Sequence, residues 1–166
     1  MQAETDSREA RRILGHYPTG VCAVTAVSDS LPVAMVVGSF TSVSLDPLLV
    51  AFLSSRHSMT WPKIRASDAF CVNVLSARQR SVCVTLCSSA PDKFAEIAYR
   101  LAASGLPIIG GAVAWFDCEL HAVHEAGDHY IAIGKVRQAH VESHDDPLVF
   151  LRGSYATAIP SDALTA

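Results

Sequence analysis

Small polar side chains cluster at two places between residues 32 and 61, each time directly after an apolar run. Residues 33–37 lead into the hydroxyl-rich segment GSFTSVS at 38–44, and residues 48–53 lead into SSRHSMTW at 54–61. Hydroxyls and backbone N–H groups can bind the carbonyls and nitrogens of a ring, and Gly38 permits a close approach to the backbone. The pattern indicates a cradle for a polar, planar ligand, with an ordinary serine-rich turn as the alternative.

The second polar segment also suits an anion, because it combines the Arg56 guanidinium with four hydroxyls, those of Ser54, Ser55, Ser58 and Thr60. Guanidinium and hydroxyl groups together are typical of phosphate sites, and Lys93 is a further candidate cation. The alternative is that Ser58 or Thr60 caps a short helix with Pro62 in its first turn. Capping does not exclude phosphate binding, so both roles stay open.

Three common nucleotide and hydrolase motifs are absent from the sequence. There is no G-x-G-x-x-G after a strand, no G-x-S-x-G elbow and no Walker loop. The sequence therefore gives no sign of a Rossmann dinucleotide site.

The order of several short motifs resembles that of the short-chain flavin reductases, the small reductase components of two-component flavin monooxygenases. Each motif is short, but together they are collinear over about residues 10–156: YPTGV at 17–21, GSFTSVSLDP at 38–47, SMTW at 58–61, FCVNVL at 70–75, DKFA at 92–95, GDH at 127–129 and RGSY at 152–155. The resemblance implies an FMN-binding split barrel, an antiparallel Greek-key type of β-barrel with a few helices, usually as a homodimer. It also implies an NAD(P)H-dependent enzyme that passes hydride to FMN or FAD and supplies reduced flavin to a partner oxygenase.

The same resemblance assigns site residues in three groups. Those expected to hold the isoalloxazine ring are Val33, Ala34, Met35, Val36, Val37, Gly38, Ser39 and Phe40. At the ribityl and phosphate end the resemblance gives Leu53, Ser54, Ser55, Met59, Thr60 and Trp61, and the residue types add Ser58 and Lys93. Those expected near the nicotinamide nucleotide are His129, the one catalytic candidate, and Arg152, Gly153, Ser154 and Tyr155.

Two departures from the family pattern concern flavin recognition. Many relatives carry Gly-Met-Thr where this chain has Ala34, Met35 and Val36, so no side-chain hydroxyl is available at Val36. Many also carry Arg-Phe where this chain has Thr85 and Leu86, which removes a cation. A flavin-binding protein of the same fold without reductase turnover is therefore the alternative function.

A metal site is the second alternative. Asp117, Glu119 and His121 alternate along one strand and share a face, but their spacing fits no closed zinc pattern. We expect no metal there and a solvated or dimer-facing strand surface instead.

Periodicity predicts a mainly β chain with few helices. Strands are expected at 21–27, 33–37, 48–53, 70–75, 112–123, 129–141 and 148–151, and helices at 6–16 (capped by Asp6 or Ser7), from about residue 58, at 77–86 and at 92–99. The tail after Ala158 is expected to be mobile. Many strands joined by few crossings favour a closed antiparallel barrel over a parallel sheet.

Composition bounds the function further. A chain of 166 residues with 50% hydrophobic residues is expected to form one domain with a substantial core. Its net charge of −3 argues against nucleic-acid and membrane-surface partners. The apolar runs are too short to span a bilayer, and residues 1–12 do not resemble a secretory signal. Five cysteines without a CxxC pair predict reduced thiols and a cytoplasmic location.

Overall fold

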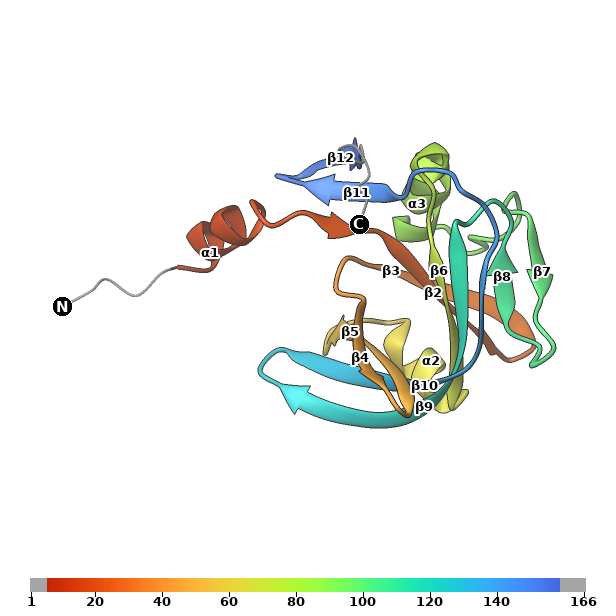
Figure 1. Ribbon diagram of the computed structural model, residues 1–166. Coiled ribbons are helices and arrows are strands. Elements are labelled where there is room, and N and C mark those ends of the chain that lie inside the picture. Colours follow the sequence, from red (N-terminus) through yellow and green to blue (C-terminus); the bar gives the residue numbers. More distant parts are fainter. Residues whose placement is uncertain (1–5, 159–166) are drawn as a thin grey trace, which may run out of the picture.

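The computed structural model describes residues 6–158, and most of them lie in antiparallel strands (Figure 1). In chain order the elements are α1 (Ser7–Leu14), β1 (Thr19–Gly20), β2 (Cys22–Ser28), β3 (Leu31–Val37), β4 (Thr41–Leu45), β5 (Leu48–Ser55), α2 (Trp61–Ala66), β6 (Ala69–Val74), the 3-10 helix η1 (Ala77–Gln79), α3 (Arg80–Cys87), β7 (Tyr99–Leu101), β8 (Pro107–Ile109), β9 (Ala114–Ala126), β10 (His129–Val141), β11 (Leu148–Leu151) and β12 (Ser154–Thr157). The mainly β class predicted from the sequence is confirmed.

One seven-stranded sheet, in the order β3-β2-β6-β9-β10-β5-β4, forms the body of the molecule. The sheet curls around α2 (Figure 1). The apolar core inside it includes Phe52, Phe70 and Trp61 of α2, whose rings contact one another through Phe52. Smaller sheets, β1-β11-β12 and β7-β8, lie on its outside. No helix in residues 6–158 has both the length and the apolar character needed to cross a membrane.

The long β9–β10 hairpin forms because its sequence alternates and ends in a tight turn. Gly127 has a φ of 61°, in the left-handed region that glycine adopts without strain. β10 pairs with β9 on one side and with β5 on the other, so that His129 lies opposite both Ala126 and Ser55. The hairpin therefore carries His129 to the end of β5.

A buried polar cluster at Asn73 joins three elements of the core. The Asn73 amide nitrogen donates to Ala23 O at 3.2 Å and to Thr25 Oγ1 at 3.1 Å, and its Oδ1 accepts from Ile109 N at 2.8 Å. Asn73 and Thr25 are both fully buried. Because every partner is inside the protein, these bonds determine how β2, β6 and β8 sit together.

Helix α1 begins where the sequence predicted, since the Asp6 carboxylate accepts the N–H groups of Arg8 at 2.8 Å and Glu9 at 2.7 Å. None of the residues of α1 is buried, and the helix projects away from the sheet (Figure 1). Ile13 and Leu14 are 52% and 70% exposed, and Tyr17, which follows the helix, is 75% exposed.

Two local predictions are wrong. Residues 92–98 form bends and turns instead of a helix, and Tyr99 begins β7. The Asp92 carboxylate accepts Phe94 N–H at 3.0 Å, which bends the chain there. The segment 38–44 is only partly a loop, since Thr41–Leu45 is strand β4, paired with β5. The hydroxyl-rich composition of this segment does not indicate a strand, and the strand forms because it pairs with β5.

Replacing Asn73 by alanine should lower the free energy of unfolding by about 2–4 kcal/mol, because Ile109 N and the β2 groups would lose buried partners. Urea denaturation of Asn73→Ala beside Gln138→Ala, an exposed amide on β10, measures the difference. Equal stability of the two variants would contradict a structural role for the cluster.

Candidate functional site

A cavity of about 360 Å³ opens where β3 and β5 end and β10 begins, and we call it the serine pocket. Its walls come from segments far apart in the sequence: Met35, Val36, Val37, Gly38, Ser39, Leu53, Ser55, Ser58 and His129. Nine residues predicted to share one site are thus brought together. The pocket combines an apolar wall with three hydroxyls and one imidazole, which suits a flat ring with polar edges.

Ser39 holds the two main walls of the serine pocket together. Its Oγ accepts Leu53 N–H at 2.9 Å, which joins the turn after β3 to β5. A Cβ at Gly38 would lie 2.7 Å from Thr19 Oγ1, so any larger residue there would force the Thr19 side chain to shift. The close approach predicted for Gly38 is made to the protein itself.

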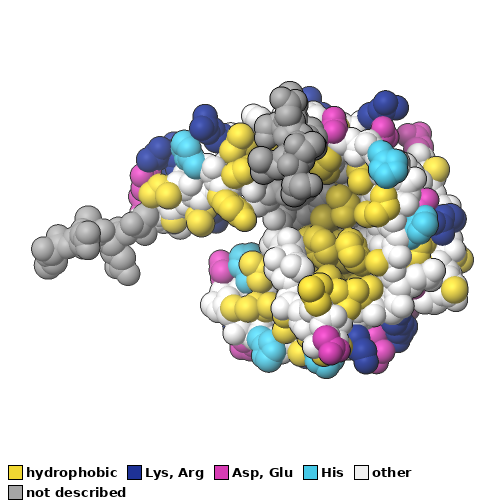
Figure 2. Space-filling view, in the orientation of Figure 1, with side chains coloured by type: hydrophobic (Ala, Val, Ile, Leu, Met, Phe, Trp, Pro, Cys, Tyr) yellow, Lys and Arg dark blue, Asp and Glu magenta, His cyan; other side chains and the backbone are white. Residues whose placement is uncertain are grey.

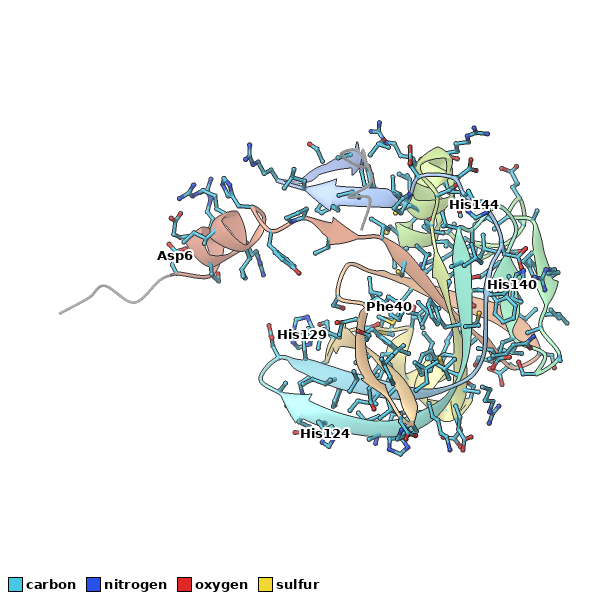
Figure 3. All side chains as sticks on the ribbon, viewed as in Figure 1. Asp6, Phe40, His124, His129, His140 and His144 are labelled. Carbon is cyan, nitrogen blue, oxygen red and sulfur yellow. The ribbon has the colours of Figure 1, made fainter. Side chains whose placement is uncertain are left out.

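His129 lies on the side of the β9–β10 hairpin that faces the turn carrying Phe40, whereas His124 lies on the opposite side (Figure 3). Its Nδ1 is 2.7 Å from Asp128 Oδ1. This hydrogen bond lowers the pKa of the fully exposed Asp128 carboxyl below its usual value. The ring is thereby oriented by its neighbour at the mouth of the pocket.

Arg56 contacts the β9–β10 hairpin and does not line the serine pocket, although the sequence suggested that it binds a phosphate. Its backbone N–H donates to Asp128 O at 2.9 Å, and its guanidinium lies 3.6 Å from Glu125 and 5.6 Å from the centre of the Tyr130 ring. Tyr130 stacks on the buried Trp61 at 6.0 Å. Arg56 therefore fastens the hairpin tip, with His129, to the segment after β5.

Ser58 acts as a cap for α2, as one of the two sequence alternatives proposed. Its Oγ accepts Trp61 N–H at 3.1 Å and Thr60 N–H at 3.3 Å, whereas the Thr60 side chain makes no capping bond. Ser58 also lines the serine pocket, so capping and ligand contact are compatible.

A second cavity, of about 440 Å³, lies further along β3, and we call it the lysine groove. Lys63 and Lys93 face it, and the other lining residues are Leu31, Pro32, Val33, Ala34, Thr60, Ala90, Pro91, Asp92, Phe94 and Tyr99. Lys93 Nζ donates to Leu86 O at 2.8 Å, which holds the ammonium in place. Of the predicted site residues, Val33, Ala34, Thr60 and Lys93 line this groove.

The remaining predicted residues line neither cavity. Trp61 and Ser54 are 3% and 1% exposed and belong to the interior, and Phe40 packs on Phe116 with ring centres 5.2 Å apart. Met59 is 86% exposed. Arg152, Gly153, Ser154 and Tyr155 form the β11–β12 turn and the start of β12, where the Tyr155 hydroxyl is 3.2 Å from Cys83 Sγ.

Sequence reasoning missed Lys63, Tyr99 and Leu31, all of which line the lysine groove. Each comes from a different element and none belongs to a motif with its neighbours. Only Lys63 had a nearby signal, since it directly follows the S-M-T-W-P segment.

The strand face carrying Asp117, Glu119 and His121 is not a uniform solvated surface. Asp117 is 3% exposed and accepts a hydrogen bond from Ser104, which lies between β7 and β8. Glu119 instead faces solvent and binds Arg137 at 3.1 Å. In residues 6–158, no three His, Cys, Asp or Glu side chains are grouped so as to hold a metal ion.

The family model described as "Flavin reductase like domain" matches residues 14–158. The chain belongs to this family. A flavin reductase from Pseudomonas putida is 56% identical over 93% of this chain and 92% of its own length. The crystal structure of nitrilotriacetate monooxygenase component B from Mycobacterium thermoresistibile is 41% identical, covers 97% of this chain and 96% of that chain, and superimposes with a TM-score of 0.89.

A third flavin reductase relative is the Streptomyces globisporus NADH:FAD oxidoreductase SgcE6, whose structure holds NAD and FAD fragments. It is 33% identical, with a TM-score of 0.89, over 98% of this chain and 99% of that chain. Together these matches confirm the predicted family, the barrel fold and the class of enzyme, an oxidoreductase that reduces flavin.

Replacing Ser58 by alanine should lower the free energy of unfolding by about 1 kcal/mol, because two N–H groups at the start of α2 lose their acceptor. Thr60→Ala is the matched control and should be nearly neutral, since its hydroxyl makes no capping bond. Melting temperatures of the two variants measure the difference. A larger loss of stability in Thr60→Ala than in Ser58→Ala would contradict the observed cap.

Proposed function

We propose that this chain transfers hydride from NADH or NADPH to FMN or FAD and releases reduced flavin to a separate monooxygenase. The support comes from relatives named flavin reductase, monooxygenase component B and NADH:FAD oxidoreductase. The single structural observation that carries the proposal is the meeting of residues 35–39, the end of β5 and His129 in one pocket.

The residues of the serine pocket fit an isoalloxazine ring. Val36 and Leu53 offer apolar surface, and Leu53 is 41% exposed although it is a large apolar residue. Ser55 and Ser58 offer hydroxyls at the rim, while Val36 leaves ring recognition on β3 to the backbone. A bound flavin would supply the redox chemistry, and the protein would supply orientation and exclusion of water.

We assign the phosphate end of the flavin to the boundary between the two cavities. Ser58 lines the serine pocket, whereas Thr60 and Lys93 line the lysine groove. The Lys93 ammonium lies at Leu86 O, beside Thr85, where many relatives carry a cation that this chain lacks. A lysine from a different segment thus offers the charge that a phosphate requires.

His129 is the proposed contact for the nicotinamide. Its ring lines the open mouth of the serine pocket and is oriented by Asp128. From there it can position a nicotinamide stacked against the flavin. Arg152–Tyr155 stay a weaker assignment to the nicotinamide nucleotide, because they line neither cavity.

We further propose a homodimer in the cytoplasm. An isolated helix of eight residues is marginal in water, yet α1 has no buried residue and exposes Ile13 and Leu14. Hydrophobic side chains also gather in a hollow on the main body of the molecule (Figure 2). A second copy of the chain would cover both surfaces. All five cysteines are free and four are buried, which suits a reducing compartment.

The purified protein should oxidise NADH or NADPH only when a flavin is added, and EDTA should not change the rate. Absorbance at the nicotinamide band with FMN, FAD or riboflavin measures this. Ser39→Ala should raise the KM for flavin about fivefold, since the bond to Leu53 contributes about 1 kcal/mol. Ser42→Ala on the exposed strand β4 is the control. No rate above the flavin-only background with any pair of substrates would refute the proposed function.

Sedimentation at micromolar concentration should show a dimer. Leu14→Asp combined with Tyr17→Asp should dissociate it, because charges would replace the apolar face of the arm. Leu101→Asp, at a site 59% exposed on β7 and far from α1, should leave the dimer intact (Figure 1). A monomeric, fully active wild-type protein would contradict the dimer.

A further inference from the structure

Two of the five cysteines, Cys83 and Cys87, lie one turn apart on α3, and we call them the thiol pair. Cys83 is buried, with 1% of its surface exposed, whereas Cys87 is exposed and is the last residue of the helix. Residues four apart in a helix share a face, so the two side chains are neighbours. The pair thus joins an accessible thiol to a protected one, and the proposed function uses neither.

Cys83 is the fixed member of the thiol pair. Its side chain belongs to a core cluster with Leu75 and Leu86, and its Sγ lies 3.2 Å from the Tyr155 hydroxyl. The contact with Cys83 raises the pKa of Tyr155 to about 12, so this hydroxyl stays protonated and can donate to the sulfur. A movement that brings the two sulfurs together must therefore come mainly from Cys87.

Cys87 lies where α3 stops, so its backbone can move without disturbing a continuing helix. Ser88 is extended, with a ψ of 170°, and its N–H and hydroxyl donate to Thr85 O at 3.1 and 2.7 Å. Helix geometry places Cα atoms four residues apart at about 6 Å, within the range that a disulfide spans, and their Cβ atoms at about 5–6 Å. A disulfide needs Cβ atoms about 4 Å apart, so the last turn must tighten by about 1–2 Å.

Movement at Cys87 reaches the lysine groove through one carbonyl. Leu86 O and Cys87 N belong to the same planar peptide unit, so tightening of the last turn reorients Leu86 O. This oxygen is the acceptor that holds the Lys93 ammonium at 2.8 Å. Lys93 lines the groove and is the cation assigned to the flavin phosphate. Closing the thiol pair would therefore displace the Lys93 ammonium from its present position.

We propose that the thiol pair is an oxidation site, at which peroxide forms a Cys83–Cys87 disulfide and thereby weakens binding of the flavin phosphate. The inference rests on the proposed function, in which Lys93 contacts that phosphate. The same function supplies the oxidant, because released reduced flavin that meets dioxygen transfers two electrons to it and yields hydrogen peroxide. Accumulating peroxide would then slow the reductase from which it arises.

The oxidation balances with two thiols and one peroxide. The Cys87 thiolate attacks one peroxide oxygen, the O–O bond breaks, and the other oxygen leaves as water once protonated, which gives a sulfenic acid. The Cys83 sulfur then attacks the Cys87 sulfur, an S–S bond forms, and the sulfenic oxygen leaves as a second water. Burial and the neighbouring Cys83 raise the pKa of Cys87, whereas Lys93 acts in the opposite direction. A thiol that is mostly protonated reacts slowly, so the site responds to sustained peroxide and not to traces.

The first measurement locates the oxidation. Full-length protein treated with hydrogen peroxide, and then with catalase, should lose two of its five free thiols. Trypsin releases residues 81–93 as one peptide with both cysteines, and mass spectrometry should find it lighter by two hydrogen atoms until dithiothreitol is added. A peptide of unchanged mass, a gain of oxygen on Cys87 alone, or a disulfide between two chains would overturn the proposal.

The second measurement compares the dissociation constants for FMN and riboflavin, read by flavin fluorescence, before and after oxidation. The constant for FMN should rise about tenfold, the effect of one lost contact to a charged group, whereas riboflavin lacks the phosphate and should bind as before. Cys87→Ser should abolish the response. Cys22→Ala, which removes a buried thiol on β2, should retain it. Unchanged FMN affinity in the disulfide form, or an equal loss for both flavins, would overturn the proposal.

Neither measurement requires turnover, so the oxidation site and the reductase function can fail separately. A disulfide that lowers FMN affinity, in a protein that oxidises neither NADH nor NADPH, would support the site and refute only the reductase function. Flavin-dependent oxidation of NADH or NADPH, together with an FMN affinity that peroxide does not change, would leave the function standing and overturn the site.

Discussion

The pairing of β5 with β10 is the constraint on which the site depends. It places His129 opposite Ser55 and Ile131 opposite Leu53, so an imidazole from the hairpin meets the hydroxyls that follow β5. A slip of one residue would turn every one of these side chains to the other face of the sheet. Arg56 reinforces the register from outside, because it binds the hairpin tip through Asp128 O and the Tyr130 ring.

Strand β3 complements this arrangement as an edge strand with two functions. It pairs with β2 along its whole length, which leaves its other edge without a ladder partner in the seven-stranded sheet. An unpaired edge offers backbone N–H and C=O groups, which are usually a liability in a sheet. Here both cavities lie along β3, and backbone groups suit a ring that Val36 cannot bind through a side chain. In the proposed function, this exposed edge serves as the surface that binds the flavin ring.

Much of the fold was predictable because its signals are local. Strand β2 is rich in β-branched residues, apolar and polar residues alternate along β9, and Gly127 marks a tight hairpin. Each pattern predicts its element correctly without knowledge of distant contacts. Strand β4 was missed because its serines and threonines resemble a loop, and only pairing with β5 makes them a strand. Phe94 and Ile97 lie three residues apart, as in a helix, yet both reach the core from a chain of turns.

The sequence by itself determined the family, the mainly β class and the segments from which the site is built, because collinear motifs and strand periods are properties of neighbouring residues. The tertiary structure decided which members of those segments line a cavity. Trp61 and Ser54 lie within the predicted segments but are buried, since α2 and β5 must fill the core before they can serve a site. Lys63 and Tyr99 carry no shared motif and meet only through folding. Cavities are formed by long-range packing, and no local pattern encodes which side chains from distant elements will face one another.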